Sequence, residues 1–347
     1  MKILLVGSFL HPMYAPAFKI GFKKLGHDIR CIKYEDYLYG GGLVGNFFTR
    51  LQNRYHLGYK VWKYNSDIIN AVHAYHPDLV FLYRCHNVWG STAKKIKSKN
   101  IILFTYHNDD PFSGIPSEHF YTNYKSIIRF ADMNFVYRGK NLDDFKRMGI
   151  DNVRVLLPYY LEESNFNIDC KDVIPIAFLG HFENDGRDRL ILALKQAGLP
   201  VTVYNGSDWE NAPLYNQIKD VVKPGLRGAQ YNMKINECQI ALVFLSKINS
   251  DTYTRRCFEI PATKTLMLCE YTADMDRMFP ADECAVYYKS EGELVKKCKY
   301  LLSNPEVIER VAEKGYERLK EIGGSEVDRC SEVLEVFNSI KNRDKNI

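Results

Sequence analysis

Short apolar runs alternate with stretches of helical spacing along most of the chain, and this alternation limits the possible folds more than any other feature. The runs have the length and composition of buried strands. They lie at 2–7, 29–32, 79–83, 101–106, 133–137, 153–156, 174–179, 201–204, 238–245 and 265–269. Strands separated by helices favour parallel sheets, because each crossover helix returns the chain to the same edge. The sequence therefore predicts an α/β protein.

The alternation starts a second time at Ile174–Leu179, after a polar stretch at 158–172 that has no periodicity. A chain of 347 residues is also too long for one core of ordinary size. We therefore expect two Rossmann-like domains, residues 1–160 and residues 161–325. A last helix, at about 326–347, is expected to pack back on the first domain.

Composition excludes several classes of protein. No apolar run approaches the roughly 20 residues of a spanning helix, and the start of the chain has the pattern of a strand rather than of a signal peptide. The nine cysteines form no CxxC pair, which favours reduced thiols in a cytoplasmic protein over disulfides or zinc. No GxGxxG follows the first strand, so a dinucleotide fingerprint is absent.

Positive charge is concentrated in the first half of the chain. Residues 1–160 contain 22 Lys and Arg against 12 Asp and Glu, whereas the remainder is net acidic. Residues 47–75 form a long basic, aromatic and amphipathic stretch. Such a half can contact an anionic membrane or an acidic substrate, although a solvated face without a partner is the plain alternative. The basic residues are dispersed and no nucleic-acid motif is present, so nucleic acid is not an expected partner.

Residues 249–270 (NSDTYTRRCFEIPATKTLMLCE) are the strongest candidate for a binding site. They lie between two predicted strands, and ligands of open α/β folds bind beyond the carboxyl ends of strands. A helix that starts there offers free N–H groups to an anion. On a helix, eight steps make about 800°, which would bring Asp251 and Glu259 within roughly 80° of the same side. The polar and charged residues of this stretch are Ser250, Asp251, Thr252, Tyr253, Arg255, Arg256 and Glu259.

Two further clusters follow predicted strands. His107, Asp109 and Asp110 lie in HNDDP after the strand at 101–106 and are candidate site residues, or else form an Asx-type turn. Metal binding by the two aspartates is disfavoured, because adjacent carboxylates of an extended chain point apart. Gly180 ends another strand, and Arg187 lies in the first turn of the next helix, where the helix dipole disfavours a cation unless a ligand anion is bound.

With these residues in place, the chain resembles the GT-B glycosyltransferases, most closely those of the group 1 (family 4) type and their CgeB-like subset. YNMKINECQIALVFL, TRRCFEIPATKTLMLCEY and YHNDDP carry the resemblance. The family has two glutamates separated by seven residues, and Asp251 and Glu259 keep that spacing with Asp in the first position.

The resemblance implies a role for each candidate. Glu259 would hold the ribose hydroxyls of a nucleotide, Asp251 would face the donor sugar, and His107 would touch that sugar. Phosphate would be bound by Arg187 together with Arg255 or Arg256, and the base by the loop at Arg227. Donor binding would also involve Gly180, Ser250, Thr252 and Tyr253, and the acceptor side would involve Asp109 and Asp110.

The implied reaction is transfer of a sugar from a nucleotide-sugar donor to a glycan or lipid-linked acceptor, with retention, in cell-surface polysaccharide synthesis. No cofactor or metal is expected, because the arginines supply the positive charge. The enzyme would be cytoplasmic, with peripheral contact to the inner face of the membrane through its basic domain. A sugar-nucleotide epimerase and a non-catalytic sugar-nucleotide-binding protein remain as alternatives, since a fold does not determine a function.

Overall fold

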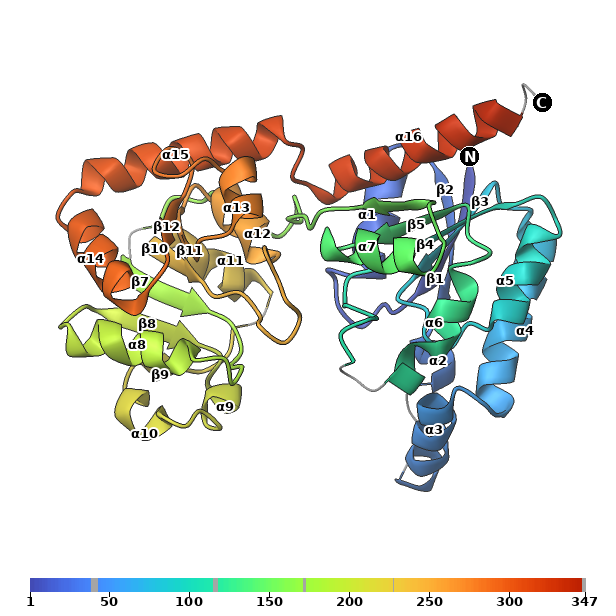
Figure 1. The fold of residues 1–347 in the computed structure, drawn as a ribbon, viewed down its shortest axis with the longest axis horizontal. Helices are drawn as coiled ribbons and strands as arrows, with labels where there is room; N and C mark the ends of the chain where they lie inside the picture. The colour runs from blue at the N-terminus through green and yellow to red at the C-terminus, as the bar shows by residue number, and fades with distance from the viewer. Residues whose placement is uncertain (39–42, 115–117, 171–172, 227, 345–347) are drawn as a thin grey trace. The chain divides into compact units, whose positions relative to one another are not determined.

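The computed structural model describes residues 1–38, 43–114, 118–170, 173–226 and 228–344. The chain divides into two compact units: unit 1 comprises Met1–Leu157 and Glu326–Ile347, and unit 2 comprises Pro158–Ser325. Each unit is built on one six-stranded sheet with helices on its faces (Figure 1). Within the described residues, no helix combines the length and the apolar composition that crossing a membrane requires.

The sheet of unit 1 has the strand order β2-β1-β3-β4-β5-β6, and every neighbouring pair is parallel. Its strands are β1 (Lys2–Gly7), β2 (Asp28–Lys33), β3 (Leu79–Tyr83), β4 (Ile102–His107), β5 (Met133–Val136) and β6 (Val153–Val155). Its helices are α1 (Ala15–Lys24), α2 (Glu35–Leu38), α3 (Leu43–Tyr55), α4 (Tyr59–Tyr75), α5 (Gly90–Lys97), η1 (Glu118–Tyr121), α6 (Thr122–Ile127), α7 (Lys140–Arg147) and α16 (Glu326–Asp344).

Both faces of the unit 1 sheet are covered, as parallel sheets require. On one face, apolar residues of β1, β3 and β4 pack against helices α4 and α5. On the other face, Phe18 and Phe22 of α1 contact Phe81 of β3. Helix α16 packs on α1, where Gly21 leaves room for Cys330. The carboxyl-terminal helix therefore belongs to the same core as the first strands.

The sheet of unit 2 is also parallel, with the order β12-β11-β10-β7-β8-β9. Its strands are β7 (Ile174–Leu179), β8 (Val201–Tyr204), β9 (Val222–Lys223), β10 (Cys238–Val243), β11 (Leu266–Glu270) and β12 (Val286–Tyr288). Its helices are α8 (Arg187–Gln196), α9 (Gly206–Trp209), α10 (Tyr215–Ile218), α11 (Ala229–Asn236), α12 (Arg256–Ala262), α13 (Ala273–Met278), α14 (Glu291–Leu302) and α15 (Pro305–Glu321). One face of the sheet packs against α8, α14 and α15 around a core that includes Phe178, Leu242 and Leu268.

The prediction of two α/β domains with parallel sheets is confirmed. Each of the ten predicted strands is present with ends displaced by at most two residues. The short strands β9 and β12 were not predicted. The amphipathic stretch at 47–75 is two helices, because His56 and Gly58 adopt positive φ between α3 and α4.

Candidate functional site

The candidate donor site lies at the carboxyl edge of the sheet of unit 2. Strands β7 and β10 are parallel neighbours there, so the loops that follow them emerge at the same edge. The first loop runs from Gly180 to Gly186 and ends at helix α8, and the second runs through 244–255 and ends at helix α12. Nearly all of the residues predicted to bind the donor are on these two loops or in the first turn of the helix after them.

Gly180 and Arg256 form one structural unit at this edge. The Nε atom of Arg256 donates to the carbonyl of Leu179 at 2.7 Å, and the guanidinium lies over the Phe178 ring, 5.2 Å from its centroid. A Cβ on Gly180 would stand 2.7 Å from Cζ of Arg256, closer than real Cβ contacts. Glycine at this position therefore lets the cation cross the end of β7.

Glu259 is buried at 6% exposure, and both of its carboxylate oxygens have partners. Nε of Arg255 donates to Oε1 at 2.5 Å, and the hydroxyl of Tyr231 donates to Oε2 at 2.8 Å. Burial and the Glu259 charge raise the pKa of Tyr231 well above its usual value, which keeps its proton available to the carboxylate. Tyr231, on α11, was missed as a site residue, because a tyrosine 28 positions away has no spacing signal.

Arg187 is placed differently from the expectation of an exposed phosphate ligand. It is buried, and its guanidinium makes a two-point ion pair with Asp185, with distances of 2.9 and 2.6 Å, while also donating to the carbonyl of His181 at 2.7 Å. The helix dipole argument assumed that a ligand must balance this cation. In the structure Asp185 balances it, and Arg187 shapes the loop between β7 and α8.

Glu183 joins the two loops of the donor edge. It accepts from the Ser246 hydroxyl at 2.6 Å and from His181 Nε2 at 2.8 Å. Burial alone would raise the pKa of Glu183, but hydrogen bonds from His181 and Ser246 and the charge of Arg187 lower it to about 2. The carboxylate is therefore ionised at neutral pH and fixes the loop after β10 against the loop after β7.

The residues from Ser250 to Tyr253 precede helix α12 and are not part of it. The backbone N–H of Asp251 donates to Ser246 at 2.9 Å, and Ser250 has a positive φ. The hydroxyl of Thr252 donates to Asp274 at 2.7 Å, and Tyr253 is buried.

Because α12 begins at Arg256, the argument that eight helical steps place Asp251 and Glu259 on one side is wrong. The chain between them is a loop that bends before the helix starts. Their functional pairing stays a prediction.

A second group of predicted residues lies at the carboxyl edge of the sheet of unit 1. His107 ends β4, and its Nδ1 accepts from the Asp109 N–H at 3.1 Å. The carboxylate of Asp109 pairs with Arg84, while the buried carboxylate of Asp110 pairs with Lys140 at 2.7 Å. The two aspartates therefore bind different cations.

His86 is a further member of this group that sequence reasoning did not find. Its ring centroid lies 4.9 Å from that of His107, and Nδ1 of His86 and Nε2 of His107 are buried with no hydrogen-bond partner among the residues that the structure describes. Burial lowers the pKa of both histidines well below the usual value, so both are neutral at pH 7. Candidate ligand atoms of His86, His107 and Asp109 lie within 4.8 Å of one another. They could hold a metal, although a bound ion would compete with Arg84 for Asp109.

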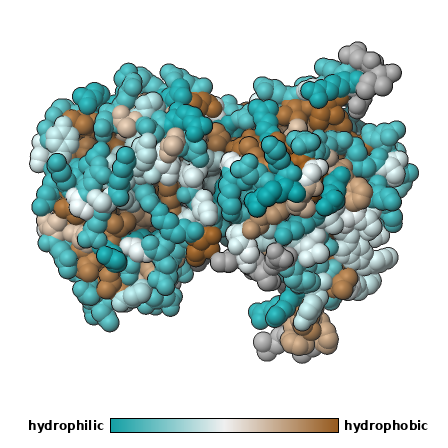
Figure 2. Space-filling view, viewed as in Figure 1, coloured by the Kyte–Doolittle hydropathy of each residue, from teal (hydrophilic) through white to brown (hydrophobic). Residues whose placement is uncertain are grey.

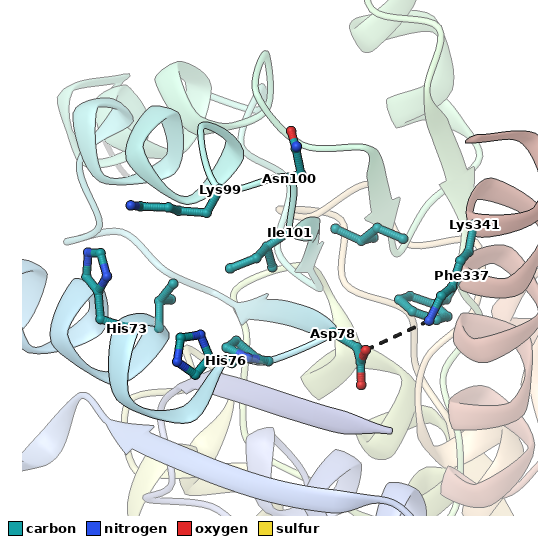
Figure 3. A pocket seen from close by; sticks show the side chains of 11 residues that line it. His73, His76, Asp78, Lys99, Asn100, Ile101, Phe337 and Lys341 are labelled. Atoms are coloured by element: carbon teal, nitrogen blue, oxygen red, sulfur yellow. Dashed lines mark ion pairs between the residues drawn. The ribbon is translucent and has the colours of Figure 1, made fainter. Parts of the chain in front are cut away.

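The remaining predicted donor residue, Arg227, lies outside the described residues. A separate cavity of about 460 Å³ lies in unit 1 beyond the amino ends of β3 and β4, at the opposite end of these strands from His107 (Figure 3). An ion pair of 3.8 Å between Asp78 and Lys341 borders it, and Lys99 and His76 line it. None of the predicted site residues that the structure describes lines this cavity.

Comparison with known proteins bears on both units. Residues 187–322 match the family model described as glycosyl transferase-like. No curated protein matches the sequence.

Solved structures resemble the whole chain. Sucrose-phosphate synthase from Thermosynechococcus elongatus superposes with a TM-score of 0.71 at 10% identity, covering 99% of this chain and 100% of its own. Anabaena HepE in complex with UDP and glucose gives 0.72 at 13% identity, covering 98% and 100%. A UDP-N-acetylglucosamine 2-epimerase candidate from Listeria monocytogenes gives 0.60 at 10% identity, covering 99% and 97%. The chain therefore has the GT-B fold, as the sequence predicts.

Proposed function

We propose that this protein is a glycosyltransferase that moves a sugar from a nucleotide-sugar donor to a glycan or lipid-linked acceptor. The observation that carries the proposal is the Glu259 carboxylate, held by Arg255 and Tyr231 at the carboxyl edge of unit 2, inside the segment that matches the glycosyl transferase-like family. A fixed carboxylate can accept two hydroxyl hydrogen bonds from a ribose. The CgeB-like subset is the proposed place of the chain within this group.

In the proposed reaction the bond between the anomeric carbon and the donor phosphate breaks, and a bond from that carbon to the acceptor oxygen forms. Negative charge grows on the departing phosphate. Arg256 beside Gly180 can stabilise this charge. The acceptor proton leaves with the phosphate group, retention is the proposed stereochemistry, and no metal ion is required.

The remaining predicted residues take supporting roles in this proposal. Asp251 and His107 are proposed to face the transferred sugar, and Asp109 and Asp110 to lie on the acceptor side. UDP-sugars are the first donors to test, because HepE was solved with UDP and glucose. The proposed setting is cell-surface polysaccharide synthesis at the cytoplasmic face of the membrane.

The test is thermal stability with UDP, GDP, dTDP and CDP, on the wild type and on Glu259→Gln. A ligand at a hundredfold excess over its Kd adds about 2.7 kcal/mol, which is several degrees in a protein of this size. We expect one nucleotide to raise the Tm of the wild type and to lose its effect in Glu259→Gln. Glu313→Gln is the matched control, because Glu313 is an exposed acid of the same unit that pairs with Lys264. No effect of any nucleotide on the wild type would contradict the proposal.

An epimerase on the same fold is the second candidate, favoured by the likeness to the Listeria protein. Product analysis separates the two. A transferase releases the nucleoside diphosphate only when an acceptor is present, whereas an epimerase alters the sugar without any acceptor. A protein that binds the nucleotide and does neither is the non-catalytic alternative.

A further inference from the structure

Large apolar side chains are exposed on one small part of unit 1. Among the described residues, eight large hydrophobic side chains are more than half exposed, and six of them lie between positions 47 and 62. We call these six the aromatic surface: Phe47, Phe48, Tyr55, Leu57, Tyr59 and Trp62. Exposed apolar patches of this kind mark contacts with proteins or membranes.

The aromatic surface is on helix α3 and the first turn of α4. On a helix with 100° per residue, Phe47, Leu51 and Tyr55 fall on one side, and Phe48 lies beside them. Thr49 lies roughly 150° around the helix from the centre of that side, and it is buried. The side of α3 that carries Thr49 therefore faces the body of the unit, and the aromatic side faces away from it. Helix α3 projects from unit 1 (Figure 1), and an apolar patch lies at the end of this projection (Figure 2).

The same segment is strongly basic. Residues 43–63 contain four Lys and Arg and no Asp or Glu. Arg50 and Arg54 are exposed and fall next to the aromatic side of α3, one turn apart. Lys63 is also exposed, on α4, but pairs with Asp67 at 2.8 Å. The chemistry is that of an amphipathic helix that lies in the headgroup region of an anionic bilayer, with aromatic rings inward and cations at the phosphates.

We propose that the aromatic surface docks the protein on an anionic lipid bilayer. A second copy of the chain is disfavoured as the occupant, because pairing two such surfaces would bring Arg50 and Arg54 of one copy close to those of the other. A bilayer instead supplies anionic headgroups for the arginines and, directly beneath them, an apolar interior for the rings. This docking surface rests on the proposed function, because it is where an enzyme with a lipid-linked acceptor would meet the lipid. Vesicle binding is measured without a nucleotide-sugar donor. A failure to bind vesicles is therefore distinguishable from a failure to bind the donor.

The experiment is co-sedimentation of the full chain with vesicles of phosphatidylcholine, with and without phosphatidylglycerol. We expect binding only to the anionic vesicles, weakening as salt rises. Arg50→Gln with Arg54→Gln should reduce the affinity about 25-fold, at about fivefold for each cation near the surface. Phe47→Ser with Phe48→Ser should reduce it at least about tenfold, because two rings no longer enter the bilayer.

The matched control carries Val173→Ser and Tyr300→Ser, which remove the two other large hydrophobic side chains that are more than half exposed, both in unit 2. This control should bind vesicles as the wild type does, and all variants should melt at the wild-type temperature. Equal binding to neutral and anionic vesicles, equal loss in the control, or self-association that depends on Phe47 and Phe48 would each overturn the proposal.

Tryptophan fluorescence gives a second readout. Trp62 is 53% exposed, whereas Trp209 is fully buried and Trp89 donates its indole N–H to His56. Anionic vesicles should therefore shift the Trp62 emission to the blue, and lipids brominated in their acyl chains should quench it. Trp62→Phe should abolish both changes while the protein still sediments with vesicles. An unchanged Trp62 spectrum under conditions of full vesicle binding would contradict docking through this surface.

Discussion

Gly180 shows how one missing side chain can determine where a cation lies. A Cβ added to Gly180 would lie 2.7 Å from Cζ of Arg256 and 2.8 Å from Cζ of Phe178. Gly180→Ala should displace Arg256 and lower the affinity for the donor nucleotide about tenfold, since a charge-assisted hydrogen bond contributes about 1.5–3 kcal/mol.

Titration with the nucleotide that stabilises the wild type checks this. Gly292→Ala is the control, because a Cβ at Gly292 meets nothing within 4 Å. Unchanged affinity in Gly180→Ala would show that Arg256 does not contact the donor.

The neutral pair His86 and His107 predicts how stability depends on pH. Burial lowers the pKa of both groups in the folded protein, while in the unfolded chain each titrates near 6.5. Below about pH 6.5 the unfolded chain therefore binds more protons, and stability falls as the pH falls, by about 1.4 kcal/mol per pH unit for each histidine.

Urea unfolding between pH 7 and pH 5 measures this slope. His107→Gln should reduce it by the contribution of one histidine. A slope that His107→Gln does not alter would mean that His107 binds protons equally in the folded and unfolded protein, which would contradict the lowered pKa.

At the residue scale the sequence identified unusual site residues more readily than the residues that bind them. Arg187 was identified correctly as unusual, because a cation in the first turn of a helix needs an explanation. The explanation is Asp185, two positions earlier, and propensity rules do not show that such a short loop lets the two side chains meet. Tyr231 and His86 reach their sites only through the packing of elements distant in sequence.

At the scale of elements, helix α16 depends on a small residue in α1. A Cβ on Gly21 would stand 2.6 Å from Sγ of Cys330 and 2.9 Å from the carbonyl of Glu326. Gly21→Ala should destabilise the protein by about 1–2 kcal/mol, because overpacking outweighs the better helix propensity of alanine.

Denaturant unfolding measures this loss. Gly139→Ala is the control, since a Cβ at Gly139 meets nothing within 4 Å and its φ is negative. If Gly21→Ala were instead more stable than the wild type, α16 would have to move to make room for the added Cβ without a loss of folding free energy.

Elements were predictable where the physical signal is local. Strands buried in a parallel sheet are continuous apolar runs, and such runs in the sequence correctly predicted ten strands. Strand β9 has only two residues, too few for a periodic signal. The helical spacing assumed between Asp251 and Glu259 was wrong because the chain before Arg256 is a loop. Hydrogen bonds of Thr252 with Asp274 and Thr272, which are distant in sequence, hold that loop.

At the scale of the molecule, two separate cores imply that a ligand of unit 2 acts first on unit 2. With the stabilising nucleotide bound, hydrogen exchange should slow most at 180–187 and 244–259, the loops and first turns of the donor edge. Exchange in the edge strand β2 of unit 1 should change least. Strongest protection within unit 1 would place the nucleotide elsewhere and contradict the assignment of the donor site.

The path of the chain between the two units has a consequence for synthesis. Unit 2 is one continuous segment, whereas unit 1 is closed by α16, which follows unit 2 in the sequence. A ribosome therefore releases every strand of unit 1 long before the helix that packs on α1 at Gly21. During translation unit 1 therefore stays incomplete, with part of its core exposed, until unit 2 has been synthesised. Chaperones would accordingly bind the amino-terminal half of the chain.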